Sequence, residues 1–436
     1  MTYKKRDNFL TFGKPTISQD EIDEVVDTLK SGWIGTGPKT KKFEQEFADY
    51  IGTKYAVALN SCTAALHLSL LALGIGDGDE VITTPLTFCA TANTIVHVGA
   101  VPVFVDIEKD SFNINPDLIE QKITSKTKAI MPVHMAGRSC DMDKIMAIAK
   151  KHNLAVIEDA AHAAESCYKN QKIGNIGNVG CFSFYVNKNI TTAEGGMITT
   201  NDAELAEKIK VLSLHGMNND AWKRFSSSGY KHYDLMYPGY KYNMTDIQSS
   251  LGLHQLKNIE VMLKRREQIW ALYDNELKDL PIILPVCNAE SNFCHSVETC
   301  HGKSLQCCNP ENIDCHPEQS EGSKIEMFCS AQHNNNNENK HNRHARHLYQ
   351  ILIDDKKTKL TRDEILNMLV AENIGTGVHY ISLHLLKYYK ERFSFQPTDF
   401  PNAKYVSDRI LSLPITPYLT DEDVLDVVNA LKKIFG

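Results

Sequence analysis

The sequence has no long apolar run and no excess of positive charge. In the 436 residues, no apolar stretch approaches the roughly 18 residues that a membrane-spanning helix needs. The first residues, MTYKKRDNFLTFGKP, lack the apolar core of a signal peptide. Lysine and arginine number 47 against 54 aspartates and glutamates, a formal net charge of -7. Nucleic acids and anionic membranes bind clustered positive charge, so neither is an expected partner. We therefore expect a cytoplasmic globular protein that acts on small molecules.

Twelve cysteines are present, but zinc-type spacing is missing. Seven of them fall in 287–342, and three of these precede a histidine, at 294/295, 300/301 and 315/316. No Cys-x-x-Cys pair or matching His-x3-His spacing accompanies them, so we expect no metal site, and no disulfides in a reducing cytosol. The same segment has an Asn run at 334–337 and almost no apolar periodicity. Because it cannot offset its ordering entropy, we predict that 287–342 is a disordered insertion.

Alternating patterns over residues 54–200 predict an α/β sheet. Short Val- and Ile-rich runs (YAVAL, DEVITT, VPVFVDI, KAIMPVH, LAVIEDA) are separated by helical patterns such as TAALHLSLLALG and MDKIMAIAKKHN. Apolar runs of this length are typical of buried parallel strands joined by helices. Such doubly wound sheets bind ligands at the carboxyl ends of their strands.

A long helical pattern begins near residue 245. It runs through TDIQSSLGLHQLKNIEVMLKRREQIWALYDNEL without proline, and further helical patterns follow after residue 342. We predict a large domain over residues 1–255 and a small C-terminal α+β domain over residues 256–436, interrupted by the insertion.

Lys188 follows an apolar strand pattern in GCFSFYVNK. Surface exposure is the usual state of a lysine. A lysine that forms a Schiff base instead needs a deprotonated amine, and a partly desolvated strand end favours that form. The pattern therefore leaves two readings of Lys188, a solvated cation or a covalent centre.

A pyridoxal phosphate site would need three further groups, and the sequence offers a candidate for each. Asp159 in AVIEDAAHA ends an apolar strand pattern and suits the pyridine nitrogen, because an opposite charge stabilises the protonated ring. The turn from Ser61 to Thr63 opens a helix whose free N–H groups favour a phosphate. Ser183 adds a hydroxyl, and Phe88 offers a face for the ring.

Each of these residues also has an ordinary explanation. A Ser/Thr turn before a helix is usually a cap, a lone Asp at a strand end is a turn former, and a lone Phe belongs to the core. The combination is more informative, because four chemical requirements are met in chain order at four strand ends. We interpret it as a pyridoxal phosphate site with Lys188 as the covalent centre.

Several longer motifs resemble those of the DegT/DnrJ-type sugar aminotransferases. They are FSFYVNKNITTAEGGMITTND, VIEDAAHA, NSCTAALHL, SGWIGTGPKTKKFEQEF and PGYKYNMTDIQSSLG, and the resemblance covers the chain apart from residues 287–342. It implies fold type I of the pyridoxal-phosphate-dependent transferases, with a mostly parallel seven-stranded sheet between helices and a small C-terminal α+β domain. SGWIGTGPKT, GYKYNMTD and GIGTGVHY are most similar to enzymes of the UDP-4-amino-4-deoxy-L-arabinose aminotransferase type, which aminate C4 of UDP-4-keto sugars.

The resemblance implies a role for each candidate residue. Lys188 would bind the cofactor covalently and Asp159 would contact its ring nitrogen. The other cofactor contacts would be Ser61, Cys62, Thr63 and Ser183 at the phosphate, Phe88 over the ring, His162 near the 3-hydroxyl group and Asn243 at the phosphate of the neighbouring subunit. The substrate contacts would be Trp33, Thr36, His379 and Tyr380.

The resemblance also implies the partners and the reaction. They are a nucleotide-activated keto sugar, an amino donor such as L-glutamate, and a second copy of the chain in a homodimer with shared active sites. The amino group would move by a ping-pong mechanism, in the synthesis of cell-surface polysaccharides such as lipopolysaccharide. Cys62 departs from the family, in which Gly or Ala is common there, but a contact through its backbone N–H tolerates the change.

Three other functions fit the same fold. A pyridoxamine-dependent sugar dehydratase resembles this motif with histidine in place of the lysine, so Lys188 argues against it. A non-enzymatic regulator would tend to lose Lys188 or Asp159, and both are present. An aminotransferase specific for C3 of a keto sugar is the main alternative.

Overall fold

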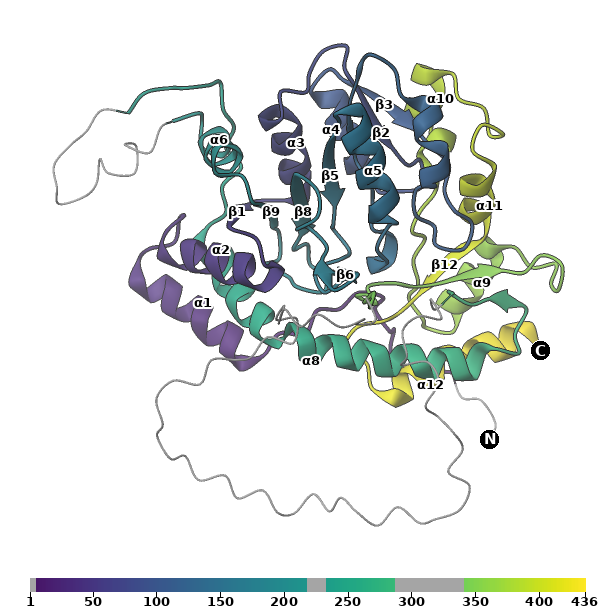
Figure 1. Ribbon diagram of the computed structural model, residues 1–436. Coiled ribbons are helices and arrows are strands. Elements are labelled where there is room, and N and C mark those ends of the chain that lie inside the picture. Colours follow the sequence, from purple (N-terminus) through teal and green to yellow (C-terminus); the bar gives the residue numbers. More distant parts are fainter. Residues whose placement is uncertain (1–4, 218–232, 287–340) are drawn as a thin grey trace, which may run out of the picture.

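The computed structural model describes residues 5–217, 233–286 and 341–436 (Figure 1). The predicted insertion at 287–342 lies outside the described residues except for its last two. Within the described ranges, no helix combines the length and the apolar character needed to cross a membrane.

A seven-stranded sheet forms the centre of the molecule. The strand order is β1 (Tyr55–Leu59), β9 (Gly196–Thr200), β8 (Val179–Ser183), β5 (Ala155–Asp159), β4 (Thr127–Ile130), β2 (Glu80–Thr83) and β3 (Val101–Phe104). The strands from β8 to β3 pair in parallel, whereas β9 pairs antiparallel with both β1 and β8. The predicted mostly parallel seven-stranded sheet is confirmed.

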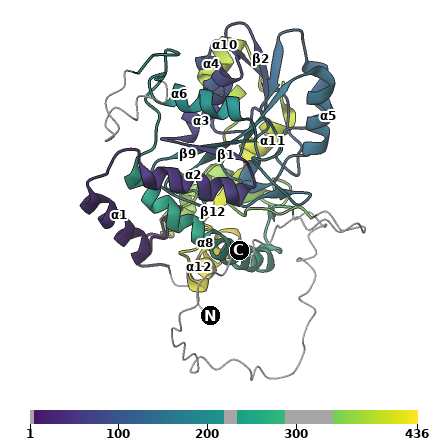
Figure 2. The ribbon, with the colours of Figure 1, turned by 60° about the vertical axis from the view of Figure 1, so that its left-hand side comes forward.

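Helices cover both faces of this sheet (Figures 1 and 2). One layer contains α3 (Cys62–Ala72), α4 (Cys89–His97) and α6 (Ala203–Ser213), and the other contains α2 (Pro38–Ile51), α5 (Met142–His152) and α8 (Asp246–Leu277). Alternate residues of β1 serve the two layers: Val57 and Leu59 pack with α3 and α6, and Ala56 and Ala58 pack on the opposite side. Burial on both faces explains the nearly continuous apolar strand sequences.

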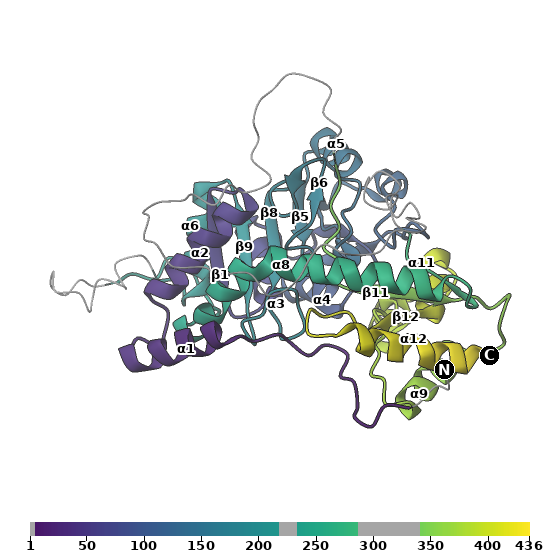
Figure 3. The same ribbon diagram turned by 90° about the horizontal axis from the view of Figure 1, so that it is seen from below.

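Helix α8 connects this sheet to the C-terminal part of the chain. It contains 32 residues and begins at Thr245, which forms a capping box with Gln248. Its first half packs against α1 (Gln19–Ser31) and α2, and its far end packs against α12 (Asp421–Phe435) (Figure 3). The long helix predicted from residue 245 is present. The predicted domain boundary after residue 255 falls inside α8 and stays a prediction.

A second, antiparallel sheet lies beside the far half of α8. It consists of β10 (Ile282–Ile283), β11 (Tyr349–Ile353) and β12 (Ile410–Leu413). Trp270 and Tyr273 of α8 share an apolar core with this sheet, with α9 (Arg362–Ala371) and with α12. The remaining elements are α10 (Lys387–Phe393), α11 (Pro401–Arg409), the hairpin of β6 (Cys167–Tyr168) and β7 (Gln171–Lys172), and 3-10 turns at Pro116–Leu118, Glu120–Lys122, Met135–Gly137 and Leu383–Leu385.

The packing of α8 on α2 depends on Gly252. A Cβ atom at Gly252 would lie 2.6 Å from the ring of Phe43, which is fully buried. We expect Gly252→Val to lower the free energy of unfolding by about 1–3 kcal/mol through overpacking. Lys257→Val places the same side chain at an exposed position of α8 and should cost only about 0.5 kcal/mol of helix propensity. Urea denaturation of both variants measures the difference, and equal midpoints would contradict the packing constraint.

Candidate active site

A cavity of about 340 Å³ opens where the carboxyl ends of β1, β2, β5 and β8 meet. Parallel strands of a doubly wound sheet bring their carboxyl ends to one edge, which is where such sheets bind ligands. The cavity is lined by ten of the residues predicted from the sequence, namely Ser61, Cys62, Thr63, Phe88, Asp159, His162, Ser183, Lys188, His379 and Tyr380. The segments that follow four strands, together with a loop from the C-terminal part, therefore form one site.

Three predicted residues do not line this cavity. The indole Nε1 of Trp33 donates to the carbonyl oxygen of Thr36 at 3.2 Å, and Asn243 Nδ2 donates to Thr36 Oγ1 at 2.6 Å. Trp33 is 57% exposed. Trp33, Thr36 and Asn243 thus contact one another outside the cavity. Their predicted contacts with substrate and with a neighbouring subunit stay predictions.

The first turn of α3 provides free N–H groups at the cavity. Ser61 is the N-cap, and its hydroxyl oxygen accepts from the Ala64 N–H at 3.1 Å. The N–H groups of Cys62 and Thr63 precede the first intrahelical bonds, so they have no acceptor within α3. Together with the helix dipole they suit a phosphate group. Ser61 thus supports the turn by capping, and the backbone N–H groups of the next two residues are left without an acceptor in α3.

Gly196 lets β9 pass directly beside this turn. A Cβ atom at Gly196 would lie 2.4 Å from the carbonyl carbon of Ser61 and 2.6 Å from the nitrogen of Cys62. The preceding Gly195 is similarly crowded, with the Thr192 hydroxyl 2.1 Å from its Cβ position. Steric crowding therefore explains why glycine occupies both positions after the Lys188 motif. Any larger residue at 196 would displace the turn at the start of α3, where a phosphate is expected.

Lys188 lies in the segment that follows β8 and is half-buried, with its side chain at the cavity. Burial lowers the pKa of Lys188 to about 8, although Cys62 and Asp159 act in the opposite direction. About a tenth of the amine is therefore unprotonated at pH 7, a few hundred times the fraction for a lysine with an ordinary pKa. This is the state that a nucleophilic lysine needs, and it argues against the surface reading of Lys188.

Asp159, at the end of β5, is held by two donors inside the protein. Thr91 Oγ1 donates to Oδ2 at 2.8 Å, and the Ala161 N–H donates to Oδ1 at 3.2 Å. Because Thr91 gives its proton to the carboxylate, it accepts from Thr87 Oγ1 at 2.8 Å. Burial raises the pKa of Asp159, whereas these two hydrogen bonds and Lys188 oppose the shift. Thr91 was not found from the sequence, because a threonine inside a helix gives no signal of its partner.

Two aromatic groups and a histidine close the cavity beside Asp159. The ring of Phe88, 57% exposed, lies 5.9 Å from that of Tyr380. The hydroxyl of Tyr380 lies 3.1 Å from His162 Nε2, and the Ala136 N–H donates to His162 Nδ1 at 3.3 Å. A ring nitrogen that accepts an N–H carries no proton, so neutral His162 is protonated at Nε2 and donates to the Tyr380 oxygen. Burial lowers the pKa of His162 well below its usual value, which agrees with a neutral ring.

His379 enters the cavity from the C-terminal part of the chain. Its Nδ1 lies 2.9 Å from Ser412 Oγ in β12, its carbonyl oxygen accepts from Gln350 Nε2 at 2.8 Å, and Phe12 stacks on its ring. Burial lowers the pKa of His379 to about 4, with a smaller contribution from Lys188. The side chain therefore presents a neutral, hydrogen-bonding ring to the cavity.

The cavity-lining residues fit pyridoxal phosphate. They provide an amine, a carboxylate, free helical N–H groups and an aromatic face in one enclosure. Metal chemistry has no comparable support, because no group of three or more potential ligands occurs among the residues that the structure describes. The Cys-His pairs considered as zinc ligands lie outside those residues.

The chain belongs to the DegT/DnrJ/EryC1/StrS aminotransferase family, whose model matches residues 15–313 and 325–432. It is 50% identical over 430 residues to the uncharacterized protein MJ1066 of Methanocaldococcus jannaschii, with 98% of each chain covered. It is 47% identical over 433 residues to the spore coat polysaccharide biosynthesis protein SpsC of Bacillus subtilis, covering 99% of this chain and 98% of the relative.

Solved structures agree with this assignment. The putative sugar aminotransferase Spr1654 of Streptococcus pneumoniae, in its PMP form, is 35% identical with a TM-score of 0.79, covering 98% of this chain and 97% of that one. The same enzyme is also solved in a PLP form. PseC of Helicobacter pylori, an aminotransferase involved in pseudoaminic acid biosynthesis, is 29% identical with a TM-score of 0.80, covering 98% and 99%. The predicted family, the fold type and the aminotransferase class are confirmed.

The lowered pKa of Lys188 is measurable without the cofactor. In cofactor-free protein, labelling of Lys188 by a small amine-reactive reagent should rise with pH with a midpoint near pH 8, because only the neutral amine reacts. Solvated lysines should continue to gain reactivity up to about pH 10.4. Peptide mass spectrometry resolves the sites, and a Lys188 profile that follows the solvated lysines would contradict the desolvated environment.

The close approach at Gly196 predicts an effect on cofactor binding. Gly196→Ala should weaken pyridoxal phosphate binding about tenfold or more, because the added methyl group displaces the Ser61–Cys62 backbone. Gly76→Ala is the matched control, since its nearest neighbour, the Val98 carbonyl oxygen, lies 3.8 Å from the Cβ position. Titration of cofactor-free protein gives both dissociation constants. Equal affinities in the two variants would show that the close approach does not shape the phosphate site.

Proposed function

We propose that this chain transfers an amino group from L-glutamate to the keto carbon of a nucleotide-activated sugar, and that the acceptor is C4 of a UDP-4-keto sugar. Pyridoxal 5′-phosphate is the cofactor of this aminotransferase. The observation that carries the proposal is the single cavity in which the desolvated amine of Lys188 faces Asp159 and the N-terminus of α3.

Each cavity residue has a proposed contact with the cofactor. When bound, pyridoxal phosphate supplies a carbonyl group that reacts with amines and a ring that withdraws electrons. Asp159 holds the proton on the ring nitrogen, because a carboxylate stabilises the adjacent positive charge. The backbone of Cys62 and Thr63, with the Ser183 hydroxyl, would bind the phosphate. Phe88 would cover the ring, and His162 would lie at the 3-hydroxyl side.

Lys188 also moves the protons of the reaction. With the amino donor in the cavity, the Lys188 amine would remove the proton from the donor's α-carbon as a general base. In the second half of the cycle, Lys188 returns a proton to the former keto carbon of the sugar. The 2-oxo acid leaves between the two halves, which gives ping-pong kinetics.

The sugar substrate is proposed from the residues at the cavity mouth and from the relatives. His379 and Tyr380 face the cavity from the C-terminal part and are proposed to contact the sugar. SpsC and PseC, both similar over nearly the full chain, are described as polysaccharide and pseudoaminic acid biosynthesis proteins. We therefore place the reaction in cytoplasmic synthesis of amino sugars for cell-surface polysaccharides. A C3-specific aminotransferase is the second candidate, since the cavity residues fit either ring position.

A homodimer is proposed to complete the site. Trp33, Ile34, Phe88 and Tyr185 are large apolar side chains with exposures of 57, 50, 57 and 45%. In the dimer, Asn243 would reach the partner's phosphate site, while Trp33 and Thr36 would face the sugar nucleotide. This arrangement accounts for three predicted residues that do not line the cavity of their own chain.

The acceptor is testable by substrate profiling. The purified protein should be yellow, lose this absorbance on addition of glutamate, and regain it with the correct keto sugar. A panel of UDP- and dTDP-linked 3-keto and 4-keto sugars, with NMR of each product, identifies the carbon that is aminated. Amination at C3 alone would overturn the proposed C4 position.

Removal of the covalent centre gives a second test. Lys188→Ala should lose the yellow absorbance and at least about 10³-fold of the amination rate, because both nucleophile and general base are missing. Lys172→Ala removes a lysine that stands over Tyr50 outside the cavity and should keep the absorbance. A Lys188→Ala enzyme that still turns over would contradict the assignment.

A further inference from the structure

Two buried histidines line the cavity next to each other. The ring centroids of His162 and His347 are 4.5 Å apart, with the planes inclined by 33°. Ala136 contacts both residues, because its N–H donates to His162 Nδ1 at 3.3 Å and its carbonyl oxygen accepts from the His347 backbone N–H at 3.1 Å. As shown above, the first of these bonds leaves His162 with its proton on Nε2.

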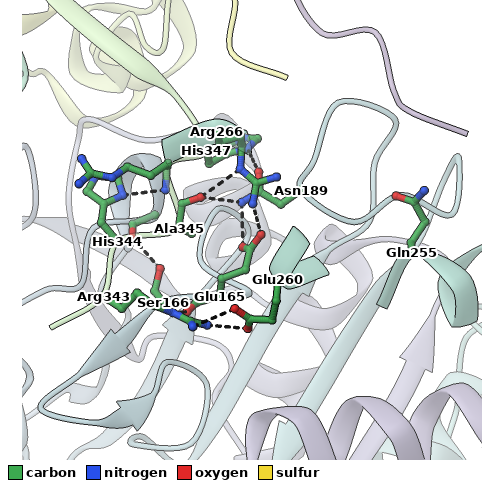
Figure 4. Close-up of polar contacts among 12 residues, drawn as sticks. Glu165, Ser166, Asn189, Gln255, Glu260, Arg266, Arg343, His344, Ala345 and His347 are labelled. Carbon is green, nitrogen blue, oxygen red and sulfur yellow. Dashed lines mark hydrogen bonds and ion pairs between the residues drawn. The ribbon is translucent and has the colours of Figure 1, made fainter. Parts of the chain in front are cut away.

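Asn189, the residue after Lys188, fixes the other histidine in the opposite tautomer (Figure 4). Asn189 Nδ2 donates to Glu165 Oε2 at 2.8 Å and to the Ala345 carbonyl oxygen at 3.1 Å. Both partners are acceptors, so the amide nitrogen faces them and Oδ1 faces His347 Nδ1 at 2.9 Å. An oxygen acceptor at this distance requires a proton on Nδ1. Neutral His347 therefore has an unprotonated Nε2, while His162 beside it has a protonated one.

A buried ion pair holds Asn189 in this orientation. Arg266 of α8 and Glu165 are 1% and 0% exposed, and Arg266 Nη2 contacts Glu165 Oε1. Arg266 Nε also donates to the Ala345 carbonyl oxygen at 3.3 Å, the same oxygen that Asn189 contacts. The pair thus leaves Glu165 Oε2 as an acceptor for Asn189. Of Arg266, Glu165, Asn189 and His347, only His347 is among the residues that line the cavity.

We propose that His347 Nε2 accepts a hydrogen bond from the bound substrate, and that Asn189, Glu165 and Arg266 are positioning residues that keep this nitrogen unprotonated. The inference rests on the proposed function, because the substrate occupies the same cavity. The group recognised is a hydrogen-bond donor, either a hydroxyl of the sugar or the amino group of the amino donor. Because the Nε2–H of His162 is directed at the Tyr380 hydroxyl, His347 Nε2 is the nitrogen of this histidine pair that is left as an acceptor for substrate.

The electrostatic surroundings support a neutral His347. Burial lowers its pKa well below the usual value, and the nearby His162, Lys188, His379 and Arg266 act in the same direction. An imidazolium ring, which has two N–H donors and no acceptor, is thereby disfavoured at neutral pH.

The tautomer can be read directly by 15N NMR of the histidine rings in the cofactor-loaded enzyme. The His347 signals are those that vanish in His347→Gln, and they should show a protonated Nδ1 and a bare Nε2. In Glu165→Gln an amide NH2 in the place of Oε2 meets the Nδ2 donor of Asn189. The Asn189 amide then turns, so that Oδ1 accepts from the glutamine and Nδ2 donates to His347 Nδ1. The ring proton should then move to Nε2 in a measurable fraction of molecules.

Glu260→Gln is the matched control for this experiment. It neutralises another acidic residue close to the network, one that pairs with Arg343 at 2.8 Å at an exposed site (Figure 4). It should leave the His347 signals unchanged. A wild-type His347 that is protonated at Nε2, or at both nitrogens, would overturn the proposal.

The two half-reactions identify which substrate supplies the donor. His347→Phe removes the acceptor and should lower kcat/KM about tenfold in one half-reaction, with glutamate or with the keto sugar. His347→Gln places an amide oxygen near the position of Nε2 and should restore most of the loss in that same half-reaction. No loss, or an equal loss in both that glutamine does not restore, would overturn the proposal. An enzyme that reacts with glutamate but aminates no sugar would contradict the proposed function and leave the NMR result intact.

Discussion

The desolvation of one amine next to one carboxylate is the constraint on which the rest of the site depends. Asp159 is the last residue of β5, and Lys188 follows the adjacent strand β8. Because β5 and β8 pair in parallel, both side chains lie at the same edge of the sheet. Burial pushes both groups toward their neutral forms, lowering the pKa of Lys188 and raising that of Asp159. The donors Thr91 and Ala161 favour the charged form of Asp159, whereas Cys62 and Asp159 offset only part of the effect of burial on the pKa of Lys188. The result is a reactive amine facing a carboxylate suited to a protonated ring.

Packing contacts outside the cavity hold this edge of the sheet in place. Helix α8 packs on the sheet layer through Gly252 and on the second sheet through Trp270 and Tyr273. Between these contacts, Arg266 reaches Glu165, in the segment after β5, and the chain leading into β11. A buried ion pair contributes little net stability unless its geometry is good, but breaking one costs several kcal/mol. This ion pair joins α8 to the segment after β5, and through its contact with Asn189 it also orients His347 in the proposed arrangement.

Much of this arrangement follows from the sequence, for identifiable reasons. The strand runs before Lys188 and Asp159 are continuous and apolar because both faces of the sheet are covered, so the strands and the ligand-binding edge of the sheet are predictable. Ser61 is recognisable because an N-cap precedes a helical pattern. Thr91, Asn189, Glu165 and His347 are not, since their partners lie far away in sequence and only the fold brings them together. Trp33, Thr36 and Asn243 do not line the cavity of their own chain, which is why their proposed contacts involve a second copy.

Chemical trapping of the cofactor tests the central claim most directly. Reduction of the yellow protein with borohydride, followed by digestion and mass spectrometry, locates the lysine that is bonded to pyridoxal phosphate. The account predicts one modified peptide, which contains CFSFYVNK and carries the cofactor mass on Lys188. Modification at a different lysine, or no modified peptide from protein that was yellow before reduction, would contradict it.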